Sequence, residues 1–283
     1  MKMAIYIALA TAALLTTACT TATTGTEGES SQAVTAAAPQ FDADSAYSYV
    51  AAQCAFGPRV PATEAHAQCA TYLTQSLNKW ADSVIVQEAP VTTFDGKRLT
   101  AKNIIAQINP TAEGRILLVA HWDCRPWADQ DPDPAKHKEP VMGANDAASG
   151  VGVLMEIARQ LKATPSQVGV DILLVDVEDW GNTDDEDSWA LGTQYWAKHP
   201  HVADYKPLYG ILLDMVGARG AQFAPEYYSA QNAPDVVQLV WGVARSSGYS
   251  SFFKSEGGGG VTDDHVAINQ AVIPCIDIID MRM

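Results

Sequence analysis

The stretch LLVDVEDWG, residues 173–181, joins an apolar run to a group of carboxylates. Residues 172–175 have the length and the apolar character of a buried strand. Asp176, Glu178 and Asp179 follow almost at once. Negative charges that lie so close together repel one another unless a cation or shared protons compensate them. The stretch therefore predicts a buried strand that ends at a site holding a cation or shared protons.

Similar apolar runs recur along the chain and alternate with helical segments. We predict strands at residues 103–108, 115–123, 168–177, 209–217 and 271–280, and helices at residues 149–163 and 235–245. Continuous apolar strands separated by helices are typical of an α/β domain whose sheet is covered on both faces. Binding sites in such sheets form at the carboxyl ends of the strands.

The composition fits one large globular domain. The chain has 283 residues, of which 47% are hydrophobic and 18% are charged. Lys and Arg number 18 against 33 Asp and Glu, so the net charge is −15. This excess argues against a nucleic-acid partner, because binding to phosphates requires Lys and Arg. It fits a soluble protein or one that holds a cation.

The N-terminus predicts export. Residues 1–18 combine Lys2, an apolar stretch and small residues, as a secretory signal does. The segment LTTAC, residues 15–19, resembles a bacterial lipobox with Cys19 as the lipidated residue, although Thr16 replaces the usual Leu. Residues 19–39 are small and polar and predict a flexible tether. We expect a membrane-anchored lipoprotein facing the periplasm, with its folded domain at residues 40–283; ordinary signal cleavage is the alternative.

Export also permits a disulfide bond among the four remaining cysteines. Cys54 and Cys69 flank a short segment and are the best candidate pair. The alternative is that Cys54, Cys69, Cys124 and Cys275 are all free buried thiols.

Polar residues stand at several of the predicted strand and helix ends. They are His121 and Asp123, Glu178 and Asp179, Asp214, Asp146 before the helix at 149–163, and Asp263, Asp264 and His265 after four glycines. Any one of them alone would be a helix cap or a solvated side chain. Together they predict a divalent metal site, for which Zn²⁺ is the best match because imidazole and carboxylate are both zinc ligands.

Strand geometry divides the work between the adjacent acids. Successive strand residues point to opposite sides, so we expect Glu178 and Asp179 to have different roles. One would bind the metal, and the other would act as a general acid/base with a raised pKa. Asp123 lies two residues after His121 on the same side of its strand and suits a supporting role behind the metal ligands.

Five motifs carry a resemblance to a known family. HWD (121–123), GANDAASG (143–150), VEDWG (177–181), LLDMVG (212–217) and TDDH (262–265) resemble the M28 zinc aminopeptidase superfamily. Within it they are most similar to glutaminyl-peptide cyclotransferases (glutaminyl cyclases) of Bacteroidetes-like bacteria. The acidic stretch WGNTDDEDSWA (180–190) and the doubled acid of TDDH favour a cyclase over an aminopeptidase. The resemblance implies a three-layer αβα sandwich with a mixed, mostly parallel central sheet.

The resemblance also implies roles for individual residues. Asp146 and Asp179 would bind one zinc ion, and Glu178 would be the catalytic acid/base. Asp214 and Asp263 would share a proton network with Glu178. His121 matches a ligand of the second metal in the aminopeptidases, and Asp264 and His265 would be structural. The family's third zinc ligand is a histidine that this chain lacks, since neither His265 nor His66, His137, His199 and His201 matches it. We therefore expect that the C-terminal part of the domain is missing.

The implied activity is conversion of the N-terminal glutamine of peptides or proteins to pyroglutamate, with release of ammonia, by a monomer. A two-metal M28 aminopeptidase and a non-catalytic homologue are the alternatives. Trp127, Trp180 and Trp189 are candidate walls of a substrate pocket, although such residues more often serve packing.

Overall fold

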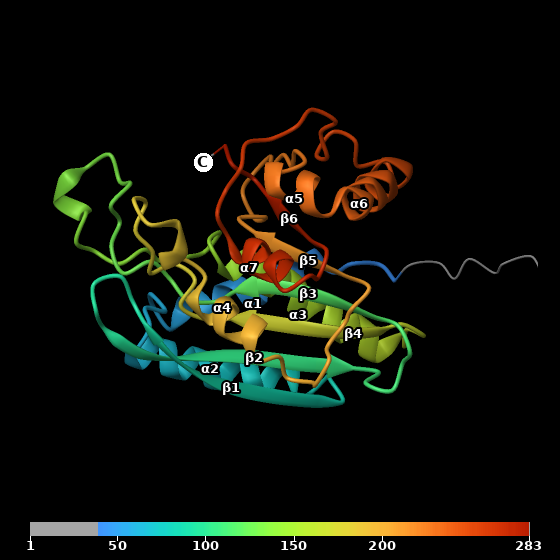
Figure 1. The fold of residues 1–283 in the computed structure, drawn as a ribbon, viewed down its shortest axis with the longest axis horizontal. Coiled ribbons are helices and arrows are strands. Elements are labelled where there is room, and N and C mark those ends of the chain that lie inside the picture. Colours follow the sequence, from blue (N-terminus) through green and yellow to red (C-terminus); the bar gives the residue numbers. More distant parts are fainter. Residues whose placement is uncertain (1–38, 283) are drawn as a thin grey trace, which may run out of the picture. The chain divides into compact units, whose positions relative to one another are not determined.

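A computed structural model describes residues 39–282 and contains one six-stranded sheet of order β1-β2-β4-β3-β5-β6 (Figure 1). The strands are β1 (Ser83–Thr92), β2 (Arg98–Ile108), β3 (Arg115–His121), β4 (Gly169–Val175), β5 (Tyr209–Asp214) and β6 (Cys275–Ile279). Strands β4, β3, β5 and β6 are parallel, and β2 runs antiparallel to both β1 and β4. The prediction of an α/β fold with a mixed, mostly parallel sheet is confirmed. The predicted signal, Cys19 and the tether up to residue 38 lie outside the described residues.

Helices cover both faces of the sheet. Helices α1 (Ala43–Ala55), α2 (Glu64–Leu77) and α3 (Ala148–Ala163) lie on one side, and α4 (Leu191–Lys198) and α7 (Asp264–Gln270) lie on the other (Figure 1). Helices α5 (Tyr227–Asn232) and α6 (Pro234–Ser246) contact β6. Short 3₁₀ helices span Pro134–Lys136 and Glu186–Ser188.

Strand alternation explains the layers. Ile172 of β4 packs in one core with Leu73 of α2 and Leu154 of α3. The next residue, Leu173, packs in a second core with Trp196 of α4. Both residues are fully buried, because a central parallel strand is covered on both faces and alternates between two apolar layers.

Several element boundaries differ from the sequence-based predictions. The two predicted helices each begin one residue earlier, and the second also ends one residue later. Strands β3 and β4 end sooner than expected, at His121 and Val175. Two residues after β4 the backbone of Val177 takes a left-handed φ of 55°, which no strand continues through. Residues 271–274 form the turn after α7, so only the second half of the last predicted strand is β6.

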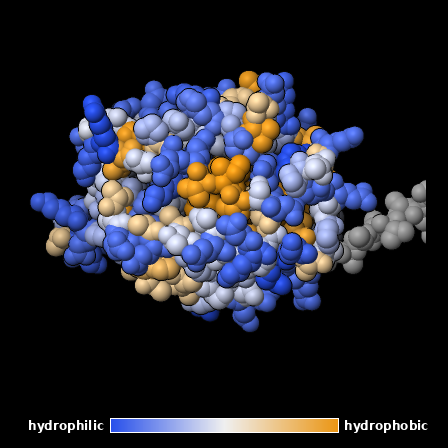
Figure 2. All heavy atoms as spheres, turned by 90° about the horizontal axis from the view of Figure 1, so that it is seen from below, coloured by the Kyte–Doolittle hydropathy of each residue, from blue (hydrophilic) through white to orange (hydrophobic). Residues whose placement is uncertain are grey.

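Among the strands of residues 39–282, β1 forms one edge of the sheet. Figure 2 views the side on which β1 lies in Figure 1 and shows an apolar area within a largely hydrophilic surface. Ile85 and Val86 of β1 are among the exposed apolar side chains. Glu88 and Pro90 interrupt the apolar character of this strand, and a charge or a proline on an edge strand opposes pairing with another chain.

Two further predictions concern disulfides and the membrane. Cys54, Cys69, Cys124 and Cys275 are all free in the structure, so the pair Cys54–Cys69 is not formed. Three of them are buried, as the free-thiol alternative states, and Cys54 is half-buried. Among residues 39–282, no helix is both long enough and apolar enough to cross a membrane.

Candidate active site

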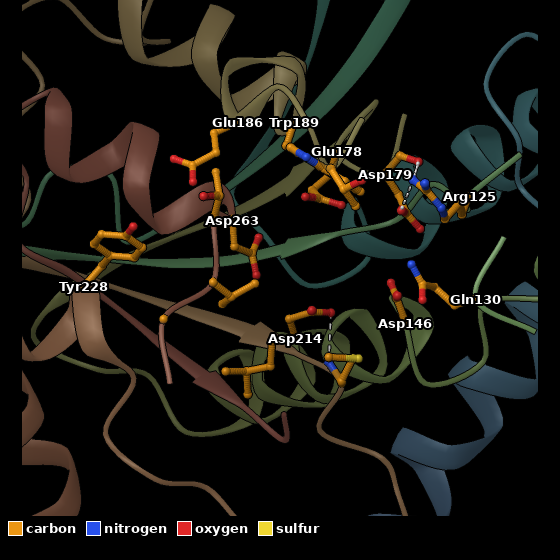
Figure 3. Close-up of a pocket in the computed structure, with 16 residues that line it drawn as sticks. Arg125, Gln130, Asp146, Glu178, Asp179, Glu186, Trp189, Asp214, Tyr228 and Asp263 are labelled. Carbon is orange, nitrogen blue, oxygen red and sulfur yellow. Dashed lines mark hydrogen bonds and ion pairs between the residues drawn. The ribbon is translucent and has the colours of Figure 1, made fainter. Parts of the chain in front are cut away.

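A cavity of about 550 Å³ opens at the carboxyl ends of the parallel strands (Figure 3). Five acidic side chains that the sequence singles out surround it, namely Asp146, Glu178, Asp179, Asp214 and Asp263. The rest of its wall includes Arg125, Gln130, Thr183, Glu186, Trp189, Met215, Tyr228 and Ile279. The structure thus brings together residues from four separate motifs, as expected at this edge of a parallel sheet.

A close backbone contact brings Asp146 to Asp214. Asp146 precedes α3, and Asp214 is the last residue of β5. A Cβ atom on Gly150 would lie 2.1 Å from the carbonyl oxygen of Leu213, so only glycine lets α3 approach β5 this closely. The buried guanidinium of Arg59 donates to the carbonyl oxygens of Met142 and Gly143 and fixes the loop that leads to Asp146.

Glu178 and Asp179 lie in a turn after β4 and not on the strand itself. The prediction that strand alternation separates them was wrong, because β4 ends at Val175 and Val177 takes a left-handed conformation before the two acids. Asp123 orients both acids, since its Oδ1 accepts from the Glu178 backbone N–H at 3.1 Å and its Oδ2 accepts from that of Asp179 at 3.3 Å. Asp123 therefore supports both acids, although β3 ends at His121 and strand alternation does not reach Asp123.

The backbone of this turn is bonded at every position. Asn103 Oδ1 accepts from the N–H of Asp176, and Asp176 Oδ1 accepts from that of Val177. Asp176 is fully buried and also contacts Nε2 of His66 at 2.9 Å. Together with Asp123, these side chains accept a hydrogen bond from each of the four consecutive N–H groups of residues 176–179.

His121 lies at the centre of the acidic group. Its Nε2 is 2.9 Å from Asp146 Oδ1 and 3.4 Å from Asp214 Oδ1. Its Nδ1 is 3.4 Å from Asp123 Oδ1 and 3.9 Å from Glu178 Oε2. Burial acts to lower the pKa of His121, but the surrounding carboxylates outweigh burial and raise this pKa well above its ordinary value. The surroundings of His121 therefore favour the protonated, positively charged imidazole.

Four of the five acidic side chains that the sequence singles out around the cavity, all except Asp146, hold their protons unusually strongly. Burial is the main cause that raises the pKa of Glu178 well above its ordinary value, and the charges of Asp263 and Asp179 raise it further. Burial and the charge of Asp146 likewise raise the pKa of Asp179. The same two causes raise the pKa of Asp214 to about 7. Such a group of acids is suited to proton transfer or to holding a cation.

Arg125 and Trp189 form one wall of the cavity. The guanidinium of Arg125 lies 4.9 Å from the ring centre of Trp189, and its Nη1 is 3.4 Å from Asp179 Oδ1. A Cβ atom on Gly181 would lie 2.0 Å from the Trp189 ring, so this glycine makes room for the indole. Of the three predicted wall residues, Trp189 lines the cavity. Trp180 is 3% exposed and packs edge-on against Trp127 at 5.7 Å, so these two rings serve packing.

Asp263, Asp264 and His265 belong to the start of α7. Asp263 caps this helix and also lines the cavity. Asp264 faces away and accepts from the hydroxyl of Thr193 at 2.6 Å. His265 contacts Glu226 at 3.0 Å. Asp264 and His265 do not line the cavity.

The donor atoms present fit a divalent metal ion. His121, Asp146 and Asp214 each offer one ligand atom, and these atoms all lie within 4.8 Å of one another. Asp179 faces the same cavity, and its pKa is raised by burial and by the charge of Asp146. Imidazole and carboxylate ligands suit zinc, and a metal ion would compensate the excess negative charge.

Several cavity residues carry no signal that a single sequence would reveal. Gln130 and Tyr228 reach the cavity from a loop and from α5. Arg125 follows Asp123 by two residues, and this closeness is the one hint of its position. The positions of Gln130 and Tyr228 at the cavity depend on how segments distant in the sequence pack together.

Solved structures of high similarity support a family assignment. A Zn-dependent exopeptidase from Parabacteroides distasonis is 50% identical with a TM-score of 0.84, and the match covers 86% of each chain. The glutaminyl cyclase of Tannerella forsythia is 49% identical with a TM-score of 0.83, and the match covers 86% of this chain and 85% of that chain. Two close relatives thus carry two different activity names.

Sequence relatives match over shorter stretches. Aminopeptidase YwaD of Bacillus subtilis is 25% identical over 169 residues, which are 58% of this chain and 31% of that protein. The chain spans less than a third of the length of the curated relatives that it matches. The model of peptidase family M28 matches residues 103–282, well over half of the chain. The chain therefore belongs to peptidase family M28.

Proposed function

We propose that this protein is a zinc-dependent glutaminyl-peptide cyclotransferase, which converts N-terminal glutamine to pyroglutamate. One observation carries the proposal: Glu178, an acid with a strongly raised pKa, stands in a cavity beside a carboxylate–imidazole group suited to zinc. The likeness to the Tannerella forsythia glutaminyl cyclase, at 49% identity over most of both chains, supports the same activity.

The reaction forms one carbon–nitrogen bond and breaks another within a single residue. The α-amine of the glutamine attacks its own side-chain carboxamide carbon, and ammonia leaves. Bound zinc would act as a Lewis acid on the amide oxygen. Because the nucleophile and the electrophile belong to one residue, a cavity that folds the side chain over supplies much of the rate through proximity.

Residues of this chain would divide the remaining work. Asp146 and Asp179 would hold the zinc, and His121 is the imidazole nearest to Asp146. Glu178 would take the proton from the attacking amine and pass it to the departing nitrogen. Asp214 and Asp263 would keep protons near Glu178, since burial raises the pKa of both. Trp189 would pack against the glutamine side chain.

An M28 aminopeptidase is the second candidate. One ligand atom each of His121, Asp146 and Asp214 lies within 4.8 Å of the others. This arrangement favours the aminopeptidase, because the group could hold a second metal ion in addition to the zinc bound by Asp179. The Parabacteroides distasonis relative, called a Zn-dependent exopeptidase, supports this reading as well.

Two substrates separate the candidates. The purified chain, supplied with Zn²⁺, is incubated with a Gln-initiated peptide and, separately, with a Leu-anilide. Ammonia release without anilide cleavage supports the cyclase. Anilide cleavage without ammonia release supports the aminopeptidase, and no reaction with either substrate favours a non-catalytic homologue.

We also propose that the protein is exported and anchored through a lipid on Cys19. The lipobox-like segment at residues 15–19 supports this. Substitution Cys19→Ala should move the protein from the membrane fraction to the soluble periplasmic fraction. An unchanged distribution would contradict lipid anchoring.

A further inference from the structure

A second cluster of ligand-type side chains lies behind the cavity, where α7 meets β6. Asp263, His265 and Asp277 each offer one atom, and these atoms lie within 4.8 Å of one another. The three residues are 4%, 0% and 0% exposed. Asp263 also lines the cavity, so the cluster adjoins the active site from the protein side. It shares no residue with the group formed by His121, Asp146 and Asp214.

The side chain of Asp277 has no partner within the described residues. Both of its carboxylate oxygens are buried and accept no hydrogen bond, although its backbone N–H donates to the hydroxyl of Ser229 at 2.9 Å. A buried carboxylate without a partner costs several kcal/mol, so folded proteins pair such groups or bind an ion with them. Asp277 therefore points to a ligand at this place.

His265 is oriented in the way that metal-binding histidines are. Its Nε2 lies 3.0 Å from Oε2 of Glu226. The Glu226 carboxylate also accepts from the N–H groups of Tyr228, Ser229 and Val261, so it is an acceptor and Nε2 must be the donor. In the neutral ring this leaves a lone pair on Nδ1, which is buried and has no hydrogen-bond partner. A carboxylate that fixes the other ring nitrogen is the usual support of a metal-bound imidazole.

We propose that Asp263, His265 and Asp277 bind a divalent transition-metal cation such as Zn²⁺ or Mn²⁺, separate from the metal of the cavity. Two carboxylates and one imidazole are a suitable ligand set for such ions. The cation would satisfy the unpaired atoms of His265 and Asp277. It would also tie the start of α7 to β6 and hold Asp263 in place at the cavity wall. The proposal does not depend on which reaction the cavity catalyses. A cation bound here would leave Asp214 alone to keep a proton near Glu178, because a carboxylate that binds a metal is deprotonated.

Metal content tests the site directly. The full chain is equilibrated with Zn²⁺, freed of unbound metal and analysed for zinc per chain by mass spectrometry. We expect Asp277→Asn to bind one zinc fewer than the wild type. Asp146→Asn should lose a different zinc, so the double variant should lose both. Asp280→Asn is the matched control, because Asp280 lies three residues away and already pairs with Arg282.

Equal zinc content in the wild type and in Asp277→Asn would overturn the proposal and show that protons or water fill the cluster. If Asp277→Asn fails to fold, the same comparison applies to His265→Gln. A crystal of the wild type measured at the zinc absorption edge needs no variant. An anomalous peak within bonding distance of Asp277 supports the site, and no peak there overturns it.

Discussion

The Asp123 carboxylate accepts a hydrogen bond from the backbone N–H of Glu178 at 3.1 Å. Asp123, shortly after β3, thereby fixes Glu178, shortly after β4. Asp123→Ala would leave this buried N–H and that of Asp179 unsatisfied, at about 1–3 kcal/mol each. We expect the free energy of unfolding to fall by at least about 2 kcal/mol in urea denaturation. Turnover should fall as well, because the acids lose their orientation. Asp184→Ala on the exposed rim is the control, and equal stability of the two variants would refute the role of Asp123.

Glu178→Gln separates proton transfer from metal binding. The amide keeps the size of the side chain but cannot carry the proton, so we expect turnover to fall by about 10²–10⁴-fold. Zinc affinity, measured by competition with a chelator, should stay close to that of the wild type. Glu186→Gln, which lines the same cavity, should retain most activity. Substantial turnover in Glu178→Gln would show that another residue is the acid/base.

The metal-free protein should lose stability as the pH rises from about 4 to about 7. Burial and the charge of Asp146 raise the pKa of Asp214 to about 7 in the folded state, against 3.8 as the ordinary value. In this pH window the folded chain retains a proton that the unfolded chain has released, so rising pH favours unfolding. The cost reaches about 4 kcal/mol for one group with this shift.

Asp214→Asn should flatten that slope, because the amide does not titrate. The measurement is the free energy of unfolding in the presence of a chelator at several pH values between 4 and 8. Asp235→Asn, at an exposed position of α6, should keep the wild-type slope. Parallel profiles for the wild type and Asp214→Asn would show that Asp214 titrates normally.

His66→Ala should destabilise the protein although His66 lies outside the cavity. Its Nε2 contacts the buried Asp176 carboxylate at 2.9 Å, and its ring stacks on Trp122 at 4.3 Å. Removing one partner of a buried hydrogen bond leaves the other unsatisfied, at about 1–3 kcal/mol, and the loss of the stacked ring adds to this. Thermal and urea unfolding would measure the loss. His199→Ala, at an exposed position, should change the free energy of unfolding by less than about 0.5 kcal/mol. An equal effect of both variants would show that the contact between His66 and Asp176 does not stabilise the fold.

The sequence predicts five of the six strands and the acidic site because both depend on local patterns, but it does not predict β1. The run at residues 172–175 forms β4, and the acids after the parallel strands meet at one edge. Strand alternation fails at Glu178 and Asp179, since the left-handed Val177 is invisible in a pattern of apolar residues.

Tertiary packing decides what the sequence does not predict. Tyr228 reaches the cavity only because α5 lies beside β6. Trp127 and Trp180 look equivalent to Trp189 in the sequence, but they pack against each other. Asp277 lies inside a predicted strand, and only the structure shows its carboxylate beside Asp263 and His265.

The four side-chain acceptors that bind the N–H groups of residues 176–179 have a dynamic consequence. Amide protons in an irregular turn usually exchange quickly with solvent, because the backbone there opens without global unfolding. Here Asn103 and Asp123 hold three of the amides from other segments, and Asp176 within the turn holds that of Val177. We expect this turn to exchange deuterium as slowly as the central strands do. Adjustment to different peptides would then fall to the exposed segment 183–187, and Glu178 and Asp179 would stay fixed while it moves.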